Sequence, residues 1–245
     1  MKIVDIKTKL KNIGVNIDEI NMGDFDFIGE FTAKRHRTNT HPLYKTTGMF
    51  YRSNYERGIL ISNLIKKYNC KSMLEIGFGR GYSTFCAAKT FNDLGVDYRI
   101  TTVDPNLGTQ ETVQHLNALK TIFPSQWFNI EFIPDISINA LKNCDNYDLI
   151  YIDGDHTYNG TKTDWELTQH HFNKLMLFDD YHLPTKTLDK SDIECNVLID
   201  QINEIEFNCS EKELIKMDRR MFIDDRSYSD EQVDYGQVLL TKFGL

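Results

Sequence analysis

The stretch that decides the fold is Lys71-Ser-Met-Leu-Glu-Ile-Gly-Phe-Gly-Arg-Gly-Tyr-Ser-Thr84. Its short apolar run, with Met73, Leu74 and Ile76, predicts a β-strand, and the residues from Tyr82 to Thr90 predict the start of a helix. Between them glycine recurs at positions 77, 79 and 81. Because glycine permits a positive φ and has no Cβ, such a turn lets the backbone approach a bound ligand closely.

The spacing of these glycines narrows the choice of ligand. A dinucleotide fingerprint, Gly-x-Gly-x-x-Gly, would need glycine at position 82, where the chain has Tyr82. A P-loop would end in Gly-Lys-Ser or Gly-Lys-Thr, and no lysine follows these glycines directly. The remaining pattern, Glu75-x-Gly77-x-Gly79-x-Gly81, fits an ordinary strand-to-helix turn as well as a cofactor site, so the rest of the chain has to decide.

Composition limits the class of protein. At 245 residues, with 40% apolar and 26% charged residues, the chain suits one large domain or one domain with an appendage. No run reaches the roughly 18 apolar residues of a membrane span, and Met1 to Asn12 lacks a signal-peptide core, so we expect a cytoplasmic protein with no membrane contact. Five scattered cysteines without a C-x-x-C pair predict neither a disulfide framework nor a zinc site. The net charge of −8 argues against a protein that binds nucleic acid over its whole surface.

Residues 1–45 lack the alternation of strands and helices that follows, and we expect them to form an N-terminal arm, with one further domain over residues 46–245. Between Thr32 and Tyr55 the chain has aromatic and basic residues and no acid. The five basic residues are Lys34, Arg35, Arg37, Lys45 and Arg52. This segment fits a solvated loop that packs its aromatic rings on the core, or a lid that meets an anionic or sugar-like molecule through cationic and stacking contacts.

The remainder of the chain alternates strands with helices. Further strands are expected at residues 98–103, 128–133, 147–152, 175–178, 213–217 with 220–223, and 237–242, and helices at residues 53–68, 82–90, 109–123, 161–172 and 193–205. This order predicts an α/β fold with a doubly wound, mainly parallel, seven-stranded sheet and an N-terminal arm. Ligands in such sheets bind outside the carboxyl ends of the strands.

Acidic residues collect at those predicted strand ends. They are Asp104, Asp135, the segment Asp153 to His156 and the segment Asp179 to His182. Asp104 follows the glycine turn at about the 20-residue spacing at which nucleotide folds place an acid for ribose hydroxyls, and a helix N-cap is its alternative role. Asp135 is equally open to an N-cap role. The meeting of these segments at one sheet edge is the strongest functional signal in the sequence.

From about Ser53 to Leu245 the chain resembles class I S-adenosylmethionine (SAM) dependent methyltransferases. It is most similar to the metal-dependent group of small-molecule and sugar O-methyltransferases, which includes family 24 and enzymes of cephalosporin and macrolide biosynthesis. The resemblance rests on Leu74 to Thr84, on Ile152-Asp-Gly-Asp-His-Thr-Tyr158 and on Phe178-Asp-Asp-Tyr181. It implies a Rossmann-like fold and SAM as the cofactor.

The same resemblance implies the roles of individual residues. A divalent cation, best Mg²⁺, would be held by Asp153, Asp179 and Asp180. Catalytic roles would fall to Asp153, Asp155 and His156. The cofactor would contact Glu75, Gly77, Phe78, Gly79, Gly81, Tyr82, Ser83, Asp104, Pro105, Asp135, Ile136 and Asp153.

The chemistry supports these roles. Methyl transfer from a sulfonium requires an acceptor oxygen that is deprotonated and placed in line, and a hard cation on carboxylates provides both. Asp155 and His156 follow Asp153, the metal ligand implied by the resemblance, and each fits a general base or a supporting role. His156 equally fits a helix cap. Catechol-type and caffeoyl-type relatives often carry a basic residue after the position of Asp155, where this chain has His156 and no lysine, so their base assignment does not transfer.

The sequence leaves three candidate functions open. The leading interpretation is a metal-assisted O-methyltransferase acting on a hydroxylated small molecule or sugar, because the chain lacks the Asn/Asp-Pro-Pro-Tyr/Phe motif of amino-methylating nucleic-acid enzymes. The alternatives are a nucleic-acid or protein methyltransferase that uses the basic arm, and a non-catalytic SAM-binding module. The acceptor, its regiochemistry and the oligomeric state, including a homo-oligomer, stay open.

Overall fold

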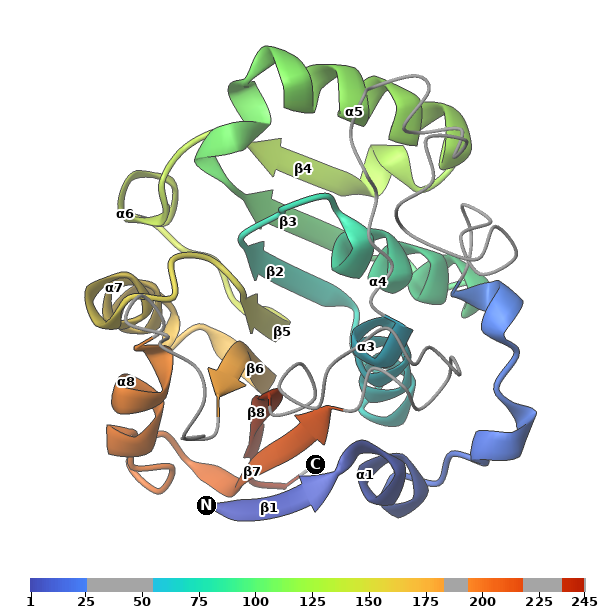
Figure 1. The fold of residues 1–245 in the computed structure, drawn as a ribbon. Helices are drawn as coiled ribbons and strands as arrows, with labels where there is room; N and C mark the ends of the chain where they lie inside the picture. The colour runs from blue at the N-terminus through green and yellow to red at the C-terminus, as the bar shows by residue number, and fades with distance from the viewer. Residues whose placement is uncertain (26–54, 183–193, 218–234, 245) are drawn as a thin grey trace.

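Eight strands in the described residues form one sheet in the order β1-β7-β8-β6-β5-β2-β3-β4 (Figure 1). This computed structural model describes residues 1–25, 55–182, 194–217 and 235–244. The strands are β1 (Lys2–Asp5), β2 (Ser72–Ile76), β3 (Arg99–Val103), β4 (Ile130–Ile133), β5 (Tyr147–Ile152), β6 (Phe172–His182), β7 (Cys209–Met217) and β8 (Tyr235–Lys242). Neighbouring strands are parallel, except that β8 is antiparallel to β6 and β7. The expected α/β fold with a mainly parallel sheet is confirmed.

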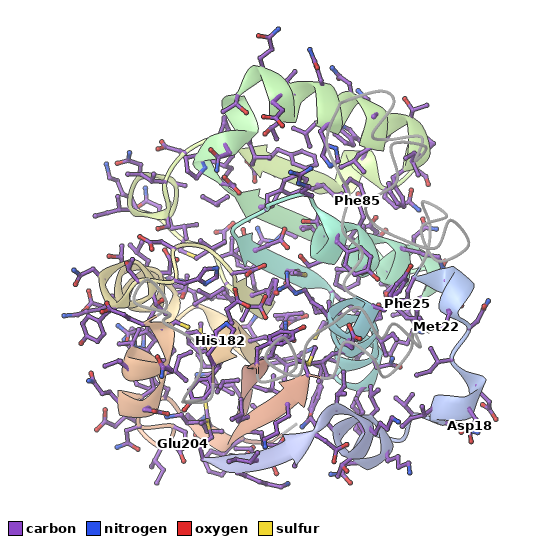
Figure 2. All side chains as sticks on the ribbon, viewed as in Figure 1. Asp18, Met22, Phe25, Phe85, His182 and Glu204 are labelled. Carbon is purple, nitrogen blue, oxygen red and sulfur yellow. The ribbon has the colours of Figure 1, made fainter. Side chains whose placement is uncertain are left out.

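Helices cover both faces of the sheet (Figure 1). They are α1 (Ile6–Asn12), α3 (Tyr55–Lys67), α4 (Tyr82–Asp93), α5 (Gln110–Ile122), α6 (Ser137–Ala140), α7 (Tyr158–Thr168) and α8 (Cys195–Gln201). Alternate residues of each strand point to opposite faces, so Met73 packs in the layer with α1, α3 and α4, and Leu74 packs in the layer with α7 and α8. Phe85 of α4 points into the first layer, where it stacks on Phe123 with ring centroids 4.4 Å apart (Figure 2). None of the described helices has both the length and the apolar composition needed to cross a bilayer.

The sheet has one strand more than the seven expected, because the start of the chain joins it. Lys2 lies opposite Glu213 and Val4 opposite Ile215, so β1 extends the sheet beyond β7. Helix α1 follows at once, capped by Asp5, whose Oδ1 accepts a hydrogen bond from the Thr8 N–H at 2.9 Å. Residues 2–12, which we expected in the N-terminal arm, therefore form a strand of the sheet and a helix packed beside it. The expected boundary at residue 45 and the expected strand at 220–223 lie outside the described residues.

A buried ion pair fastens α1 to the sheet. The Lys9 ammonium and the Glu213 carboxylate are in direct contact, and their side chains are only 4% and 2% exposed. Lys2 reaches the other oxygen of Glu213 at 2.9 Å. Burial opposes ionisation of Glu213, and the hydrogen bonds from Lys9 and Lys2 overcome it, so that its pKa lies below the ordinary value.

We expect Lys9→Ala to destabilise the protein by about 3 kcal/mol, because it leaves the buried Glu213 carboxylate without its nearest counterion. In a chain of this size that corresponds to a melting temperature lower by roughly 10 °C in a thermal melt. Lys7→Ala, on the exposed side of the same helix, is the control and should melt with the wild type. Equal melting temperatures for the two variants would contradict a structural role for the pair.

Candidate functional site

The glycine turn after β2 brings its backbone against the loop after β5. Gly77 has φ +94°, and a Cβ built there would lie 2.1 Å from the carbonyl oxygen of Asp153. Any side chain at this position would collide with backbone, which explains the requirement for glycine. Gly81, at φ +80°, is the N-cap residue of α4, and a Cβ there would lie 2.4 Å from the Phe78 ring. The predicted turn and its close backbone approach are both present.

Asp104, at the end of β3, holds the turn in place. Its Oδ2 accepts hydrogen bonds from the backbone N–H groups of Phe78 at 3.0 Å and Gly79 at 3.1 Å. Its Oδ1 accepts from the Asn106 N–H at 2.8 Å, which caps the short 3₁₀ turn that follows. The N-cap alternative raised from the sequence is therefore observed. A carboxylate oxygen can accept more than one hydrogen bond, so these contacts leave acceptor capacity for a ligand hydroxyl.

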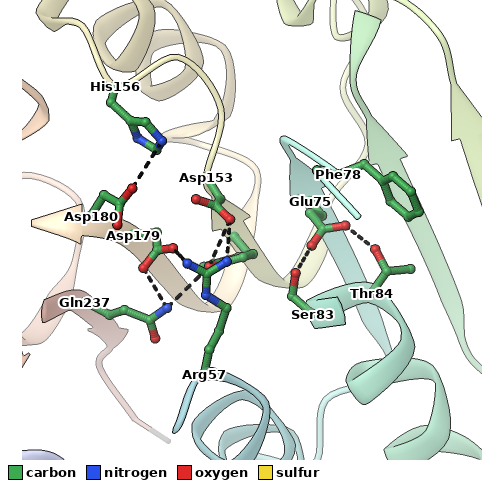
Figure 3. Close-up of polar contacts among 12 residues, drawn as sticks. Arg57, Glu75, Phe78, Ser83, Thr84, Asp153, His156, Asp179, Asp180 and Gln237 are labelled. Atoms are coloured by element: carbon green, nitrogen blue, oxygen red, sulfur yellow. Dashed lines mark hydrogen bonds and ion pairs between the residues drawn. The ribbon is translucent and has the colours of Figure 1, made fainter. Parts of the chain in front are cut away.

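Glu75 lies beneath the turn and supports it. Its buried carboxylate accepts hydrogen bonds from the hydroxyls of Ser83, Thr84 and Thr102, the last at 3.0 Å (Figure 3). Burial raises the pKa of Glu75 to about 7, although the three hydroxyls oppose the shift. The hydrogen bond between Glu75 and Ser83 thus links β2 to α4.

A cavity of about 470 Å³ opens at the carboxyl ends of β2 to β5. Its size suits a nucleoside-sized ligand. Six of the residues predicted for cofactor or catalytic roles line it: Gly77, Asp104, Pro105, Asp135, Ile136 and Asp155. The other predicted cofactor residues, Glu75, Phe78, Gly79, Gly81, Tyr82, Ser83 and Asp153, are not part of its wall. Phe78 is buried edge-on against Phe132, and the Tyr82 hydroxyl donates to the carbonyl of Phe25.

The cavity wall also contains residues that the sequence analysis missed. Asn106, Ser137, Gly154 and Asp164 are among them. Asp164 is only 3% exposed, and burial raises its pKa to about 6 although the Ser137 hydroxyl opposes the shift. Asn106 and Ser137 each follow a predicted residue closely, so proximity in sequence offered a signal. Asp164 lies within α7, on the face of the helix that is turned toward the cavity. Its position in the sequence alone does not show this.

Arg57 of α3 lies between two of the predicted metal ligands (Figure 3). Its Nη1 donates to Oδ2 of Asp153 at 2.8 Å, and its Nη2 contacts Oδ2 of Asp179 directly. Asp179 has no exposed side-chain surface, and its Oδ1 accepts from the Gln237 amide at 2.9 Å. Asp179 therefore faces a guanidinium and an amide. No motif in the sequence indicates a role for Arg57.

The pKa values in this cluster follow from burial and from Arg57. Burial raises the pKa of the Asp153 carboxyl to about 6, and the guanidinium of Arg57 opposes that shift. Burial disfavours the charged form of Arg57, but the attraction of Asp153 outweighs it and the pKa of Arg57 lies above its ordinary value. Arg57 therefore stays charged beside the two carboxylates.

Asp180 turns away from this pair and meets two histidines. Its Oδ2 lies 3.3 Å from Nε2 of His156, and its Oδ1 lies 3.9 Å from Nε2 of His182. One ligand atom each from Asp153, His156 and Asp180 lie within 4.8 Å of one another, an arrangement that fits one divalent cation. Of the three predicted metal ligands, Asp153 and Asp180 reach this position and Asp179 does not.

Asp155 stands at the junction of the cavity and this cluster. It is exposed, and its Oδ1 accepts from the Thr157 N–H at 3.0 Å. The four residues 153–156 thus contribute to both features: Gly154 and Asp155 to the cavity wall, Asp153 and His156 to the cluster. The predicted basic segment from Thr32 lies outside the described residues, apart from Tyr55.

Comparison with known proteins gives a match for the centre of the chain. Residues 74–181 match the family described as Methyltransferase domain. A search of curated protein sequences gives no match.

Solved structures share the fold at low identity. A protein from Klebsiella pneumoniae assigned as an O-methyltransferase has a TM-score of 0.57 at 13% identity, over 96% of this chain and 94% of that one. The O-methyltransferase from Bacillus cereus, in complex with SAH, has a TM-score of 0.53 at 13% identity, over 97% of both chains. TomG from Streptomyces achromogenes, an O-methyltransferase of tomaymycin synthesis in complex with SAM, has a TM-score of 0.53 at 13% identity, over 97% and 96%.

The buried carboxyl of Glu75 predicts a pH dependence of stability. Its folded pKa of about 7 lies above the ordinary value of 4.5, so the protonated group favours the folded state below about pH 4.5 and this contribution is lost as the pH rises through 7. The loss is on the order of 3 kcal/mol. Denaturant unfolding between pH 5 and 8 should therefore show a fall in the free energy of unfolding that Glu75→Gln reduces. Glu131→Gln, at an exposed strand position, should keep the wild-type slope, and a wild-type slope in Glu75→Gln would refute this account.

Proposed function

We propose that the chain transfers the methyl group of SAM to a hydroxyl oxygen of a small molecule or sugar, because residues 74–181 match a methyltransferase domain and the fold is shared with solved O-methyltransferases. One observation carries the proposal. Within the segment 153–156, Gly154 and Asp155 line the nucleoside-sized cavity, and Asp153 and His156 belong to the acidic cluster. A methyl donor in the cavity would thus lie next to groups that can orient a hydroxyl and take its proton.

The cavity supplies the features that adenosine requires. Gly77 and Gly154 contribute to the cavity wall without a side chain, and Asp104 offers carboxylate oxygens for ribose hydroxyls. Ile136, which is 48% exposed, offers an apolar surface for the adenine ring, and Asp135 beside it accepts from the Ile136 N–H at 2.7 Å. The proteins from B. cereus and S. achromogenes, solved with SAH and SAM, support this cofactor.

The reaction needs an aligned oxygen and a proton acceptor. The acceptor oxygen forms a bond to the methyl carbon while the carbon–sulfur bond breaks, its electron pair stays on sulfur, and the hydroxyl proton leaves. Among the described residues, Asp155, exposed at the cavity rim, and His156 of the cluster are two groups able to take the proton. A divalent cation held at the cluster would lower the pKa of the hydroxyl and orient it. General bases of this kind typically contribute 10² to 10⁴-fold in rate.

The charge of the cluster favours hydroxylated acceptors. Among the described residues of the cluster, the three carboxylates of Asp153, Asp179 and Asp180 outnumber the guanidinium of Arg57. Such a cluster repels phosphate groups and attracts neutral polyols or a cation that bridges to them. This argues for a sugar or other hydroxylated small molecule over a nucleic acid.

We expect SAM to bind the purified protein and Asp104→Ala to weaken binding by about 30-fold, or ~2 kcal/mol, because the variant loses both the acceptor for ribose and the anchor of the glycine turn. Isothermal titration calorimetry measures the change. The control is Asp97→Ala, which removes an exposed aspartate elsewhere in the chain. This variant should bind SAM as the wild type does. Failure of the wild type to bind SAM would overturn the proposed function.

Methyl transfer itself is tested with labelled SAM and a panel of sugars, polyols and phenols. We expect turnover on at least one hydroxylated acceptor, and we expect a chelator to lower turnover at least tenfold while calorimetric SAM binding persists. Readdition of a divalent cation should restore the rate. Methylation of nucleic acid or peptide amines in the same assay, with none of the hydroxylated acceptors used, would contradict the proposal.

A further inference from the structure

We propose that the divalent-cation site of this chain consists of Asp153, His156 and Asp180, with a histidine nitrogen in place of the carboxylate of Asp179, and that this gives it a preference for first-row transition ions over Mg²⁺. The inference deepens the proposed function, since it concerns the cation beside the same acceptor position. It differs from the three-aspartate set that the family resemblance implies.

First, Asp179 does not belong to the proposed ligand set. Its side chain has no exposed surface, and both of its oxygens already have donors, Arg57 on Oδ2 and Gln237 on Oδ1. A cation could reach Asp179 only after the guanidinium of Arg57 had left. That departure would separate a buried charge from its partners, which costs several kcal/mol. Arg57 therefore acts as a built-in counterion for Asp179.

The second step is the accessibility of the remaining groups. The side chains of Asp153, His156 and Asp180 are 16%, 30% and 24% exposed, so an ion from solvent can reach all three. Arg57 and Tyr151 contact only Oδ2 of Asp153, and Oδ1 remains available. Figure 3 shows His156 directed at Asp180, on the side of the cluster opposite Arg57.

The third step is geometry. Ligand atoms about 2.1 Å from a common ion can be at most roughly 4.2 Å apart. The three ligand atoms already lie within 4.8 Å of one another, so small side-chain rotations close the site. Two carboxylates and one imidazole on one side leave open positions on the other, where an acceptor hydroxyl and water can bind.

The ligand chemistry then sets the selectivity. Mg²⁺ and Ca²⁺ prefer oxygen, whereas imidazole favours ions such as Fe²⁺, Co²⁺, Ni²⁺ and Zn²⁺. A histidine that binds a cation through its ring nitrogen does not also take a proton there. The site therefore leaves Asp155, of the two groups offered above, as the proton acceptor.

Calorimetric titration of the SAM-free protein with Co²⁺ and, separately, with Mg²⁺ tests the proposal without any activity assay. We expect the wild type to bind Co²⁺ more tightly than Mg²⁺, and His156→Ala to weaken Co²⁺ binding at least about tenfold with a much smaller effect on Mg²⁺. His156→Asp restores an all-oxygen set and should narrow the difference between the two ions. The matched control, His182→Ala, removes the other histidine near Asp180 and should leave both affinities unchanged.

Each result decides the matter. Co²⁺ binding that is equal in wild type and His156→Ala, or lost equally in His182→Ala, would overturn the histidine ligand. Loss of Mg²⁺ and Co²⁺ affinity in equal measure in His156→Ala would overturn the selectivity. Absence of binding by either ion would overturn the site itself. Thermal melts of each variant separate misfolding from ligand loss, and SAM affinity, measured independently, separates failure of this site from failure of the proposed function.

Discussion

One guanidinium holds the carboxyl edge of the sheet together. Arg57 reaches from α3 to Asp153 after β5 and to Asp179 in β6, so three elements meet at one partly buried side chain. Without Arg57, the carboxylates of Asp153 and Asp179 would repel each other in a partly desolvated site. Removing one partner of a buried ion pair typically costs about 3–5 kcal/mol. The position of α3 against the sheet is thus coupled electrostatically to the rim where chemistry is proposed.

A second constraint joins the glycine turn to the acidic loop. The Asp153 N–H donates to the carbonyl of Ile76 at 2.8 Å, which continues the pairing of β2 and β5 past the ends of both strands. The Cβ-free backbone of Gly77 then lies against Asp153. The glycine turn and the acidic loop are therefore joined directly through backbone, and a donor and an acceptor placed on them would be held in a fixed relative position, as in-line transfer requires.

Much of this arrangement could be predicted from sequence, because it depends on local pattern and on topology. The apolar runs at Met73 to Ile76 and Asp148 to Ile152 indicate strands, and parallel order brings their carboxyl ends to one edge. Arg57 could not be found in the same way. Its helix was predicted from apolar periodicity, but nothing local tells which basic residue will face Asp179. The four residues of β1 are too few for a pattern, and their pairing with β7 depends on the far end of the chain.

That pairing has a consequence for how the molecule folds. Val4 lies opposite Ile215, so two segments that are far apart in the sequence have to meet before β1 can join the sheet. Contacts between such distant parts of a chain close slowly. We therefore expect β1 to join the edge of the sheet late in folding, with the Lys9–Glu213 ion pair fixing helix α1 there.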